Sequence, residues 1–137
     1  MRNLGEELSR HCRAGDIIVL HGPLGAGKTA LTQGIGSGLG ITGITSPTFV
    51  ISRSHEGRIR LNHIDAYRLT DISQSGFEFD DLDIDTYDSL TIIEWGAEIV
   101  ARLESDYLLI EIAFGATENE RIVTATAHGQ RWQGFQL

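Results

Sequence analysis

The sequence predicts an α/β fold, a three-layer sandwich in which helices flank a small mixed β-sheet. Two observations carry this prediction. A compact β-branched run, "DIIVL" at 16–20, leads directly into a glycine-rich turn and a helical stretch, and later apolar runs alternate between strand-like and helix-like patterns. The 137 residues, 41% hydrophobic and 22% charged, are about the size and composition of one soluble domain spanning 1–137.

The first expected element is a short amphipathic helix over 3–13. Asn3 is a possible N-cap with Glu6 three residues further on, and Gly15 would end the helix. Leu4, Leu8 and Cys12 would share one face, so Cys12 is expected to pack as a helix residue.

The remaining elements follow from periodicity and turn residues. A strand at 16–20 and a helix at 28–40 enclose the glycine-rich turn. Two period-two runs separated by "HEG" predict an antiparallel hairpin, and the rest of the chain predicts strand, helix and strand, then one or two edge strands turning at Gly129. The ranges are 48–54 and 58–65 for the hairpin, 89–95, 97–104 and 106–114 for the next three elements, and 120–137 for the tail.

Charge and composition exclude several classes of protein. Eleven basic residues against nineteen acidic ones give a net charge of −8, whereas proteins that bind nucleic acid by themselves usually have a basic face. We therefore expect no DNA binding, and any RNA to be held by a partner. No apolar run reaches the roughly 18 residues of a membrane span, and the start lacks a signal-peptide pattern, so a cytoplasmic location is expected. The single cysteine, Cys12, predicts no internal disulfide, and the histidine spacing predicts no zinc site.

The segment "GPLGAGKT" at 22–29 matches the phosphate-binding loop pattern G-x-x-x-x-G-K-[ST] and predicts a P-loop NTPase-like domain. Backbone N–H groups would surround the phosphates, Lys28 would reach the terminal phosphates, and the Thr29 hydroxyl would bind Mg²⁺. The helix that begins near Lys28 adds its positive dipole end. The expected nucleotide-binding residues here are Gly22, Pro23, Leu24, Gly25, Ala26, Gly27, Lys28, Thr29 and Ala30.

Hydrolysis also requires a carboxylate near Mg²⁺ and a group that orients water. Asp65 and Glu94 each end an apolar run, and the pattern alone does not rank them, so one would bind Mg²⁺ with Thr29 and the other would orient water. Glu111 is a weaker candidate because it lies within its expected strand. Lys28 is the only lysine, which excludes the guanine-specific N-K-x-D motif and favours ATP by elimination.

Four segments together resemble the bacterial TsaE (YjeE) ATPases: "GPLGAGKT", "SPTF" at 46–49, "HIDAYRL" at 63–69 and "IIEWG" at 92–96. Their order and spacing match that family over nearly the whole chain. The resemblance implies a P-loop α/β sheet and work with TsaB and TsaD in making threonylcarbamoyladenosine in tRNA.

The resemblance also implies roles for individual residues. Asp65 would be the Walker B acid, Glu94 would orient the attacking water as the catalytic carboxylate beside Lys28, and Trp95 would lie in the same site. Two switch segments would contain Ser46 and Thr48, then Tyr67 and Arg68. The chain departs from the family at Ala30, where family members usually have a second threonine.

These observations together predict an Mg²⁺-dependent ATPase that drives the cycle of a TsaB–TsaD complex by hydrolysis, is slow alone, and is stimulated by its partners. Two alternatives stay open at this point. One is a nucleotide-binding regulator without turnover, and the other is a small-molecule kinase, which would need an acceptor pocket lined by basic groups.

Overall fold

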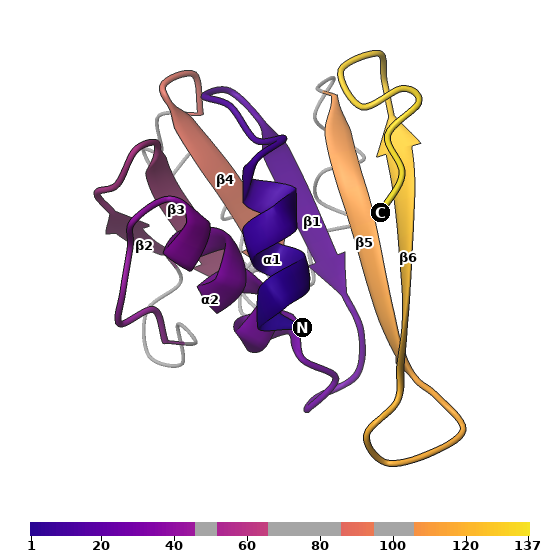
Figure 1. Ribbon diagram of the computed structural model, residues 1–137. Helices are drawn as coiled ribbons and strands as arrows, with labels where there is room; N and C mark the ends of the chain where they lie inside the picture. Colours follow the sequence, from indigo (N-terminus) through magenta and orange to yellow (C-terminus); the bar gives the residue numbers. More distant parts are fainter. Residues whose placement is uncertain (46–51, 66–85, 95–105) are drawn as a thin grey trace, which may run out of the picture.

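The computed structural model describes residues 1–45, 52–65, 86–94 and 106–137. The described ranges form one six-stranded sheet in the order β2-β3-β4-β1-β5-β6, with two helices (Figure 1), which confirms the predicted α/β fold. In chain order the elements are α1 (Arg2–Ser9), β1 (Ile17–His21), α2 (Lys28–Gly38), β2 (Ser52–His55), β3 (Arg60–Asp65), β4 (Ser89–Glu94), β5 (Tyr107–Phe114) and β6 (Arg121–His128).

The four central strands of the sheet are parallel, and the outermost strand on each side is antiparallel to its neighbour. Strands β3, β4, β1 and β5 run in one direction, while β2 pairs antiparallel with β3 and β6 pairs antiparallel with β5. The carboxyl ends of the parallel strands therefore meet at one edge of the sheet, the lower edge in Figure 1. In open α/β sheets this edge is where ligands bind.

Helices α1 and α2 lie together in front of the sheet in Figure 1 and pack against each other through two glycines. A Cβ atom on Gly34 would overlap the backbone of Arg2, and one on Gly5 would overlap the backbone of Leu31. The absence of side chains at these two positions lets the helix backbones approach each other closely, which fixes how α2 lies on the sheet.

Both faces of the central strands are buried. Ile18, Leu20 and Ile92 belong to the apolar cluster that includes residues of α1 and α2. Val19 and Ile93, which alternate with them along β1 and β4 and so point to the other face, are also fully buried. This two-sided burial is what the predicted three-layer sandwich requires.

The first helix differs from its prediction. It begins at Arg2, with Met1 rather than Asn3 as the N-cap, and ends at Ser9, well before Gly15. The backbone bonds tighten from i→i+4 to i→i+3 at Arg10, His11 and Cys12, which ends the α-helix without a glycine. Cys12 is therefore not a helix residue, although it is buried as expected and its thiol donates to the Leu8 carbonyl at 3.3 Å.

The other elements lie close to their predicted positions. The phosphate-loop helix and the β2–β3 hairpin are confirmed in the described ranges, and the tail contributes one edge strand, after which Gly129 turns the chain with a φ of 85°. Residues 130–137 form turns rather than a second strand. The expected helix at 97–104 and the hairpin residues 48–51 lie outside the described residues.

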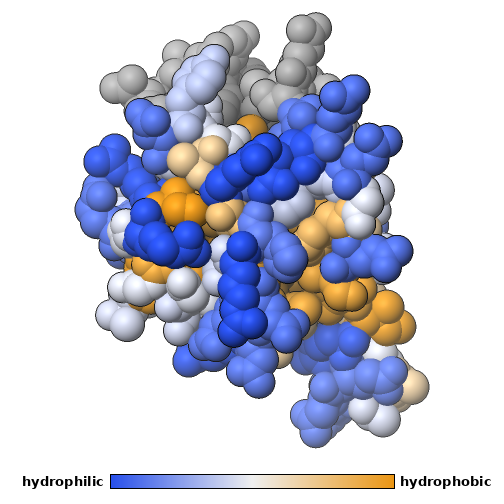
Figure 2. All heavy atoms as spheres, turned by 45° about the horizontal axis from the view of Figure 1, so that its top comes forward, coloured by the Kyte–Doolittle hydropathy of each residue, from blue (hydrophilic) through white to orange (hydrophobic). Residues whose placement is uncertain are grey.

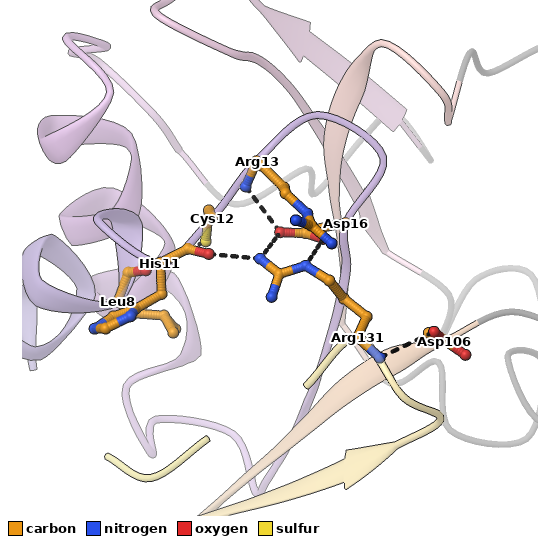
Figure 3. A network of polar contacts seen from close by, with 7 residues as sticks. All are labelled: Leu8, His11, Cys12, Arg13, Asp16, Asp106 and Arg131. Atoms are coloured by element: carbon orange, nitrogen blue, oxygen red, sulfur yellow. Dashed lines mark hydrogen bonds and ion pairs between the residues drawn. The ribbon is translucent and has the colours of Figure 1, made fainter. Parts of the chain in front are cut away.

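At the amino end of the sheet, a set of ionic contacts ties the tail to the strand β1, and we call it the Asp16 clasp (Figure 3). The Arg131 guanidinium donates to Asp16 Oδ1 at 2.8 Å and Oδ2 at 2.9 Å, and to the His11 carbonyl at 2.7 Å. The Arg13 backbone N–H donates to Asp16 Oδ2 at 2.8 Å, and that of Arg131 donates to Asp106 at 3.0 Å. The clasp thus joins segments that are 115 residues apart in the chain.

The surface at the upper end of the molecule is mostly hydrophilic, with small apolar areas between polar side chains (Figure 2). Neither described helix combines the length and apolar character that crossing a membrane demands.

Candidate functional site

The phosphate-binding loop connects the end of β1 to the start of α2, at the carboxyl edge of the sheet. Gly25 and Gly27 adopt positive φ values of 81° and 118°, conformations that side chains with a Cβ rarely adopt. Gly27 is also the N-cap of α2, and no side chain caps this helix end. The first N–H groups of α2 therefore begin directly after the loop, as anion binding at a helix N-terminus requires.

Lys28, the first residue of α2, is 6% exposed and points back into the loop. Its ammonium donates to the carbonyl oxygens of Gly22 at 2.7 Å and Pro23 at 3.0 Å. Burial lowers the pKa of Lys28 below its usual range, and the negative charges of Glu94 and then Asp65 oppose that shift. The lysine therefore lies within electrostatic range of both predicted carboxylates.

Asp65 and Glu94 are the last residues of neighbouring parallel strands. They are register partners across β3 and β4, and Glu94 is in turn paired with Leu20 of β1, two residues before the loop begins. Glu94 is 4% exposed and Asp65 is half-buried. The fold thus brings the two acids, separated by 29 positions in the chain, to the same edge as Lys28.

These residues suit a magnesium ion held together with phosphates. Mg²⁺ is commonly bound through one or two carboxylates and substrate phosphates, with water completing the shell. The half-buried Thr29 hydroxyl at the start of α2 and the Asp65 carboxylate at the end of β3 are oxygen donors of the required kind. The second carboxylate, Glu94, lies beside them.

Glu94 has a partner that the motifs did not reveal. Its Oε1 lies 3.0 Å from Nε2 of His63, and both side chains are buried. His63 stands on β3 two residues before Asp65, on the same face of the sheet. A histidine directly before Ile64 and two residues after Leu61, within the segment 63–69, was the available signal.

Glu111 does not join the site, although the reason differs from the one expected from sequence. It pairs with His21, the last residue of β1, so it lies level with the strand ends rather than short of them. The neighbouring Ile110 pairs with Leu20 and shares the face of Glu94, so Glu111 points to the opposite face, where it is exposed. Strand alternation, not position along the strand, separates it from Lys28.

Beside the loop lies an open hollow of about 460 Å³. The guanidinium of Arg121, on β6, donates from Nε to the Ala26 carbonyl at 3.0 Å and lies 4.6 Å from the centre of the Phe114 ring. The residues that line the hollow are Met1, Leu4, Gly25, Ala26, Gly27, Asn119, Arg121 and Val123. No sequence pattern indicated Asn119 or Arg121, because the β5–β6 hairpin brings them to the loop.

Several predicted residues lie outside the described part of the chain. They are Trp95, expected in the nucleotide site, and the two predicted switch segments containing Ser46, Thr48, Tyr67 and Arg68. Their roles stay predictions.

Comparison with known proteins places these residues in context. Residues 1–123 match the family described as threonylcarbamoyl adenosine biosynthesis protein TsaE. A Streptomyces coelicolor protein named tRNA threonylcarbamoyladenosine biosynthesis protein TsaE is 48% identical over 141 residues, covering 96% of this chain and 93% of that protein. Proteins of the same name from Mycobacterium tuberculosis and Bacillus subtilis are each 40% identical, covering 88% of this chain and 77% and 75% of their own lengths.

The crystal structure of YdiB from Bacillus subtilis superposes with a TM-score of 0.74 at 30% sequence identity, covering 96% of this chain and 80% of that one. The likeness therefore extends over the sheet and both helices as well as the loop.

Proposed function

The chain belongs to the TsaE family and takes part in tRNA threonylcarbamoyladenosine biosynthesis, and from this premise we propose that it acts there as a Mg²⁺-dependent ATPase. The observation that carries the proposal is the convergence of Lys28, Asp65 and Glu94 at the carboxyl edge of the sheet, directly beside the glycine-rich loop. A loop alone would account for nucleotide binding. The two carboxylates within electrostatic range of the lysine add what hydrolysis requires.

Each residue has a distinct task in this mechanism. The loop N–H groups bind the phosphate oxygens, and the Lys28 ammonium exchanges the Gly22 and Pro23 carbonyls for the terminal phosphates. Thr29 and Asp65 would hold Mg²⁺, which neutralises charge on the phosphates when bound. Glu94 orients a water molecule toward the γ-phosphorus.

The chemical step forms a bond between the water oxygen and the γ-phosphorus and breaks the bond from that phosphorus to the β–γ bridging oxygen. One water proton passes to the Glu94 carboxylate and is then released to solvent. The products are ADP and inorganic phosphate.

We place the nucleoside of ATP over the hollow beside the loop. The hollow is continuous with Gly25, Ala26 and Gly27, and it is bounded on its far side by β6. The Arg121 guanidinium is a planar, positively charged group of the kind that stacks on aromatic rings, and it is already held by Ala26 and Phe114. ATP is the preferred nucleotide because the sequence lacks the guanine-specific motif.

The proposed partners are TsaB and TsaD, with tRNA held by them rather than by this chain. The net charge of −8 supports this division, because an acidic protein does not attract the phosphate backbone. We expect slow hydrolysis by the isolated chain and stimulation when the partners complete the site.

The test is steady-state phosphate release from Mg·ATP, measured for the chain alone and with TsaB–TsaD. We expect stimulation by the partners, and a decrease of about a hundredfold or more in kcat for Glu94→Ala with nearly unchanged ATP affinity. The matched control is Glu111→Ala, an exposed acid level with the same strand ends but on the opposite face.

The outcomes separate the alternatives. ATP binding without phosphate release, alone and with partners, would favour a nucleotide-binding regulator and contradict the ATPase proposal. Equal activity of Glu94→Ala and the wild type would remove Glu94 from the mechanism.

A further inference from the structure

His63 has no assigned role, yet it is the most deeply buried ionisable residue next to the site. Its side chain is 0% exposed, and its Nε2 lies 3.0 Å from Oε1 of Glu94. The two residues stand on adjacent strands: Asp65 pairs directly with Glu94, and His63 pairs with Ile92, so the contact runs diagonally across β3 and β4. One oxygen of Glu94 is therefore engaged before any water or nucleotide arrives.

The second ring nitrogen of His63 indicates which nitrogen donates to Glu94. Nδ1 is buried and has no hydrogen-bond partner among the residues that the structure describes. If the ring proton were on Nδ1, it would be an N–H with no acceptor within the described ranges. A buried donor without an acceptor is rare and costly. The arrangement that leaves no such donor has the ring proton on Nε2, which donates to Oε1 of Glu94.

We propose that His63 is a positioning residue for ATP hydrolysis, which donates from Nε2 to Oε1 of Glu94 and thereby holds that carboxylate in one orientation. The inference rests on the proposed ATPase function. With Oε1 engaged, Oε2 is the oxygen that accepts the hydrogen bond, and then the proton, of the attacking water.

The surroundings of Glu94 explain why such a partner is needed. Its charged neighbours within the described ranges include the Lys28 ammonium and, as register partner, the Asp65 carboxylate. In the proposed function Lys28 would turn toward the phosphates of a bound nucleotide, and both acids would experience the charge of Mg²⁺. A donor fixed in the β-sheet keeps Glu94 in place through these changes.

The experiment compares three variants of the full chain in the phosphate-release assay. His63→Gln keeps an amide N–H near the position of Nε2, His63→Asn places its amide near Nδ1 instead, and His63→Leu removes the donor at similar size. We expect His63→Leu and His63→Asn to lower kcat by about thirtyfold or more with KM changed by less than about threefold, and His63→Gln to restore kcat to within about fivefold of wild type.

His55→Leu is the matched control. His55 lies on β2, and its buried Nε2 has no hydrogen-bond partner within the described ranges. His55 is therefore a partly buried histidine of the same hairpin whose Nε2 makes no hydrogen bond to Glu94. Its replacement by leucine should leave kcat unchanged. Thermal unfolding of every variant reports loss of structure separately, and if His63→Leu does not fold, the Gln and Asn pair still decides.

A double mutant tests whether His63 acts through Glu94. Adding His63→Leu to Glu94→Ala should slow hydrolysis no further, because the group being positioned is already absent. A further decrease in the double mutant would overturn the inference. So would a wild-type kcat in folded His63→Leu or folded His63→Asn. An equal loss of kcat in His63→Gln and His63→Asn would also overturn it. These results leave the ATPase function standing. Failure of the wild type to hydrolyse ATP, alone and with partners, overturns both.

Discussion

At the carboxyl end of the sheet Glu94 Oε1 lies 3.0 Å from His63 Nε2, and the other ring nitrogen has no partner in the described ranges. The Lys28 ammonium there donates to loop carbonyls, which phosphate would replace in the proposed function. At the amino end Asp16 accepts three hydrogen bonds, two from Arg131 and one from the Arg13 backbone. Both acids are 4% exposed, so burial does not distinguish them.

The difference lies in how completely each acid is satisfied by the protein itself. The Asp16 clasp pairs opposite charges with bidentate geometry and leaves little for a ligand to contribute. The Glu94 end holds a cation against neutral carbonyls and places two acids side by side, an arrangement that a phosphate and a metal ion would complete. We therefore expect substitutions at the Glu94 end to affect function and substitutions in the clasp to affect stability.

Lys28→Ala gives the largest expected effect. Loss of about two charge-assisted hydrogen bonds to phosphate, each worth roughly 1.5–3 kcal/mol, should weaken ATP binding by about a thousandfold. The free energy of unfolding should change little. Burial lowers the pKa of Lys28 in the folded chain, so below that lowered pKa folding carries a cost for burying the charged ammonium. This cost disappears as the pH rises from the lowered pKa toward 10.5. Titration calorimetry and urea unfolding measure the two quantities, and a large loss of stability would break the comparison.

Arg131→Met should have the reverse pattern. It leaves Asp16 buried without its cation, which should lower the free energy of unfolding by about 3 kcal/mol. ATP affinity and kcat should stay within about twofold of wild type below the melting temperature, because the clasp lies at the other end of the sheet. Urea unfolding and phosphate release on the same preparation check both halves, and a change in kcat would show that the two ends are coupled.

Arg131→Lys sharpens the same comparison. The substitution keeps the charge but cannot reproduce the paired bonds from Nε and Nη2 to the two oxygens of Asp16, nor reach the His11 carbonyl at the same time. We expect a loss of roughly 1–2 kcal/mol, between wild type and Arg131→Met. If Arg131→Lys equals the wild type in urea unfolding, charge alone stabilises the clasp and its geometry is irrelevant.

The sequence could predict one of these ends far better than the other. Local patterns predict the loop, α2 and the strands that end at Asp65 and Glu94. A glycine-rich motif and apolar runs that end in an acid can be recognised in the sequence without knowledge of the fold. The contact between Arg131 and Asp16 depends on the path of the tail, and that between His63 and Glu94 depends on the register of β3 against β4. Neither relation is encoded locally. The end of α1 was missed because i→i+3 bonds, not Gly15, terminate it.

The last prediction concerns Cys12, which lies beside the clasp in Figure 3. Burial, and then the negative charge of Asp16, raise the pKa of its thiol from 9.0 to about 12, while Arg131 and Arg58 partly oppose the shift. The folded chain therefore keeps this proton above pH 9, where the unfolded chain loses it. The stability from this group is present below pH 9 and is lost as the pH rises toward 12.

Urea unfolding of the wild type and Cys12→Ala at pH 8 and pH 10.5 isolates this contribution, because all other titrating groups are common to both chains. Between the two pH values the wild type should lose about 1–2 kcal/mol more than Cys12→Ala, since one pKa unit corresponds to about 1.4 kcal/mol. The cavity left by the alanine lowers stability equally at both pH values and cancels in the difference. If the free energies of unfolding of the two chains changed equally with pH, the thiol would ionise in the folded chain. The amino end of the sheet would then be open to water. The contrast with the Glu94 end would be weaker than the contacts indicate.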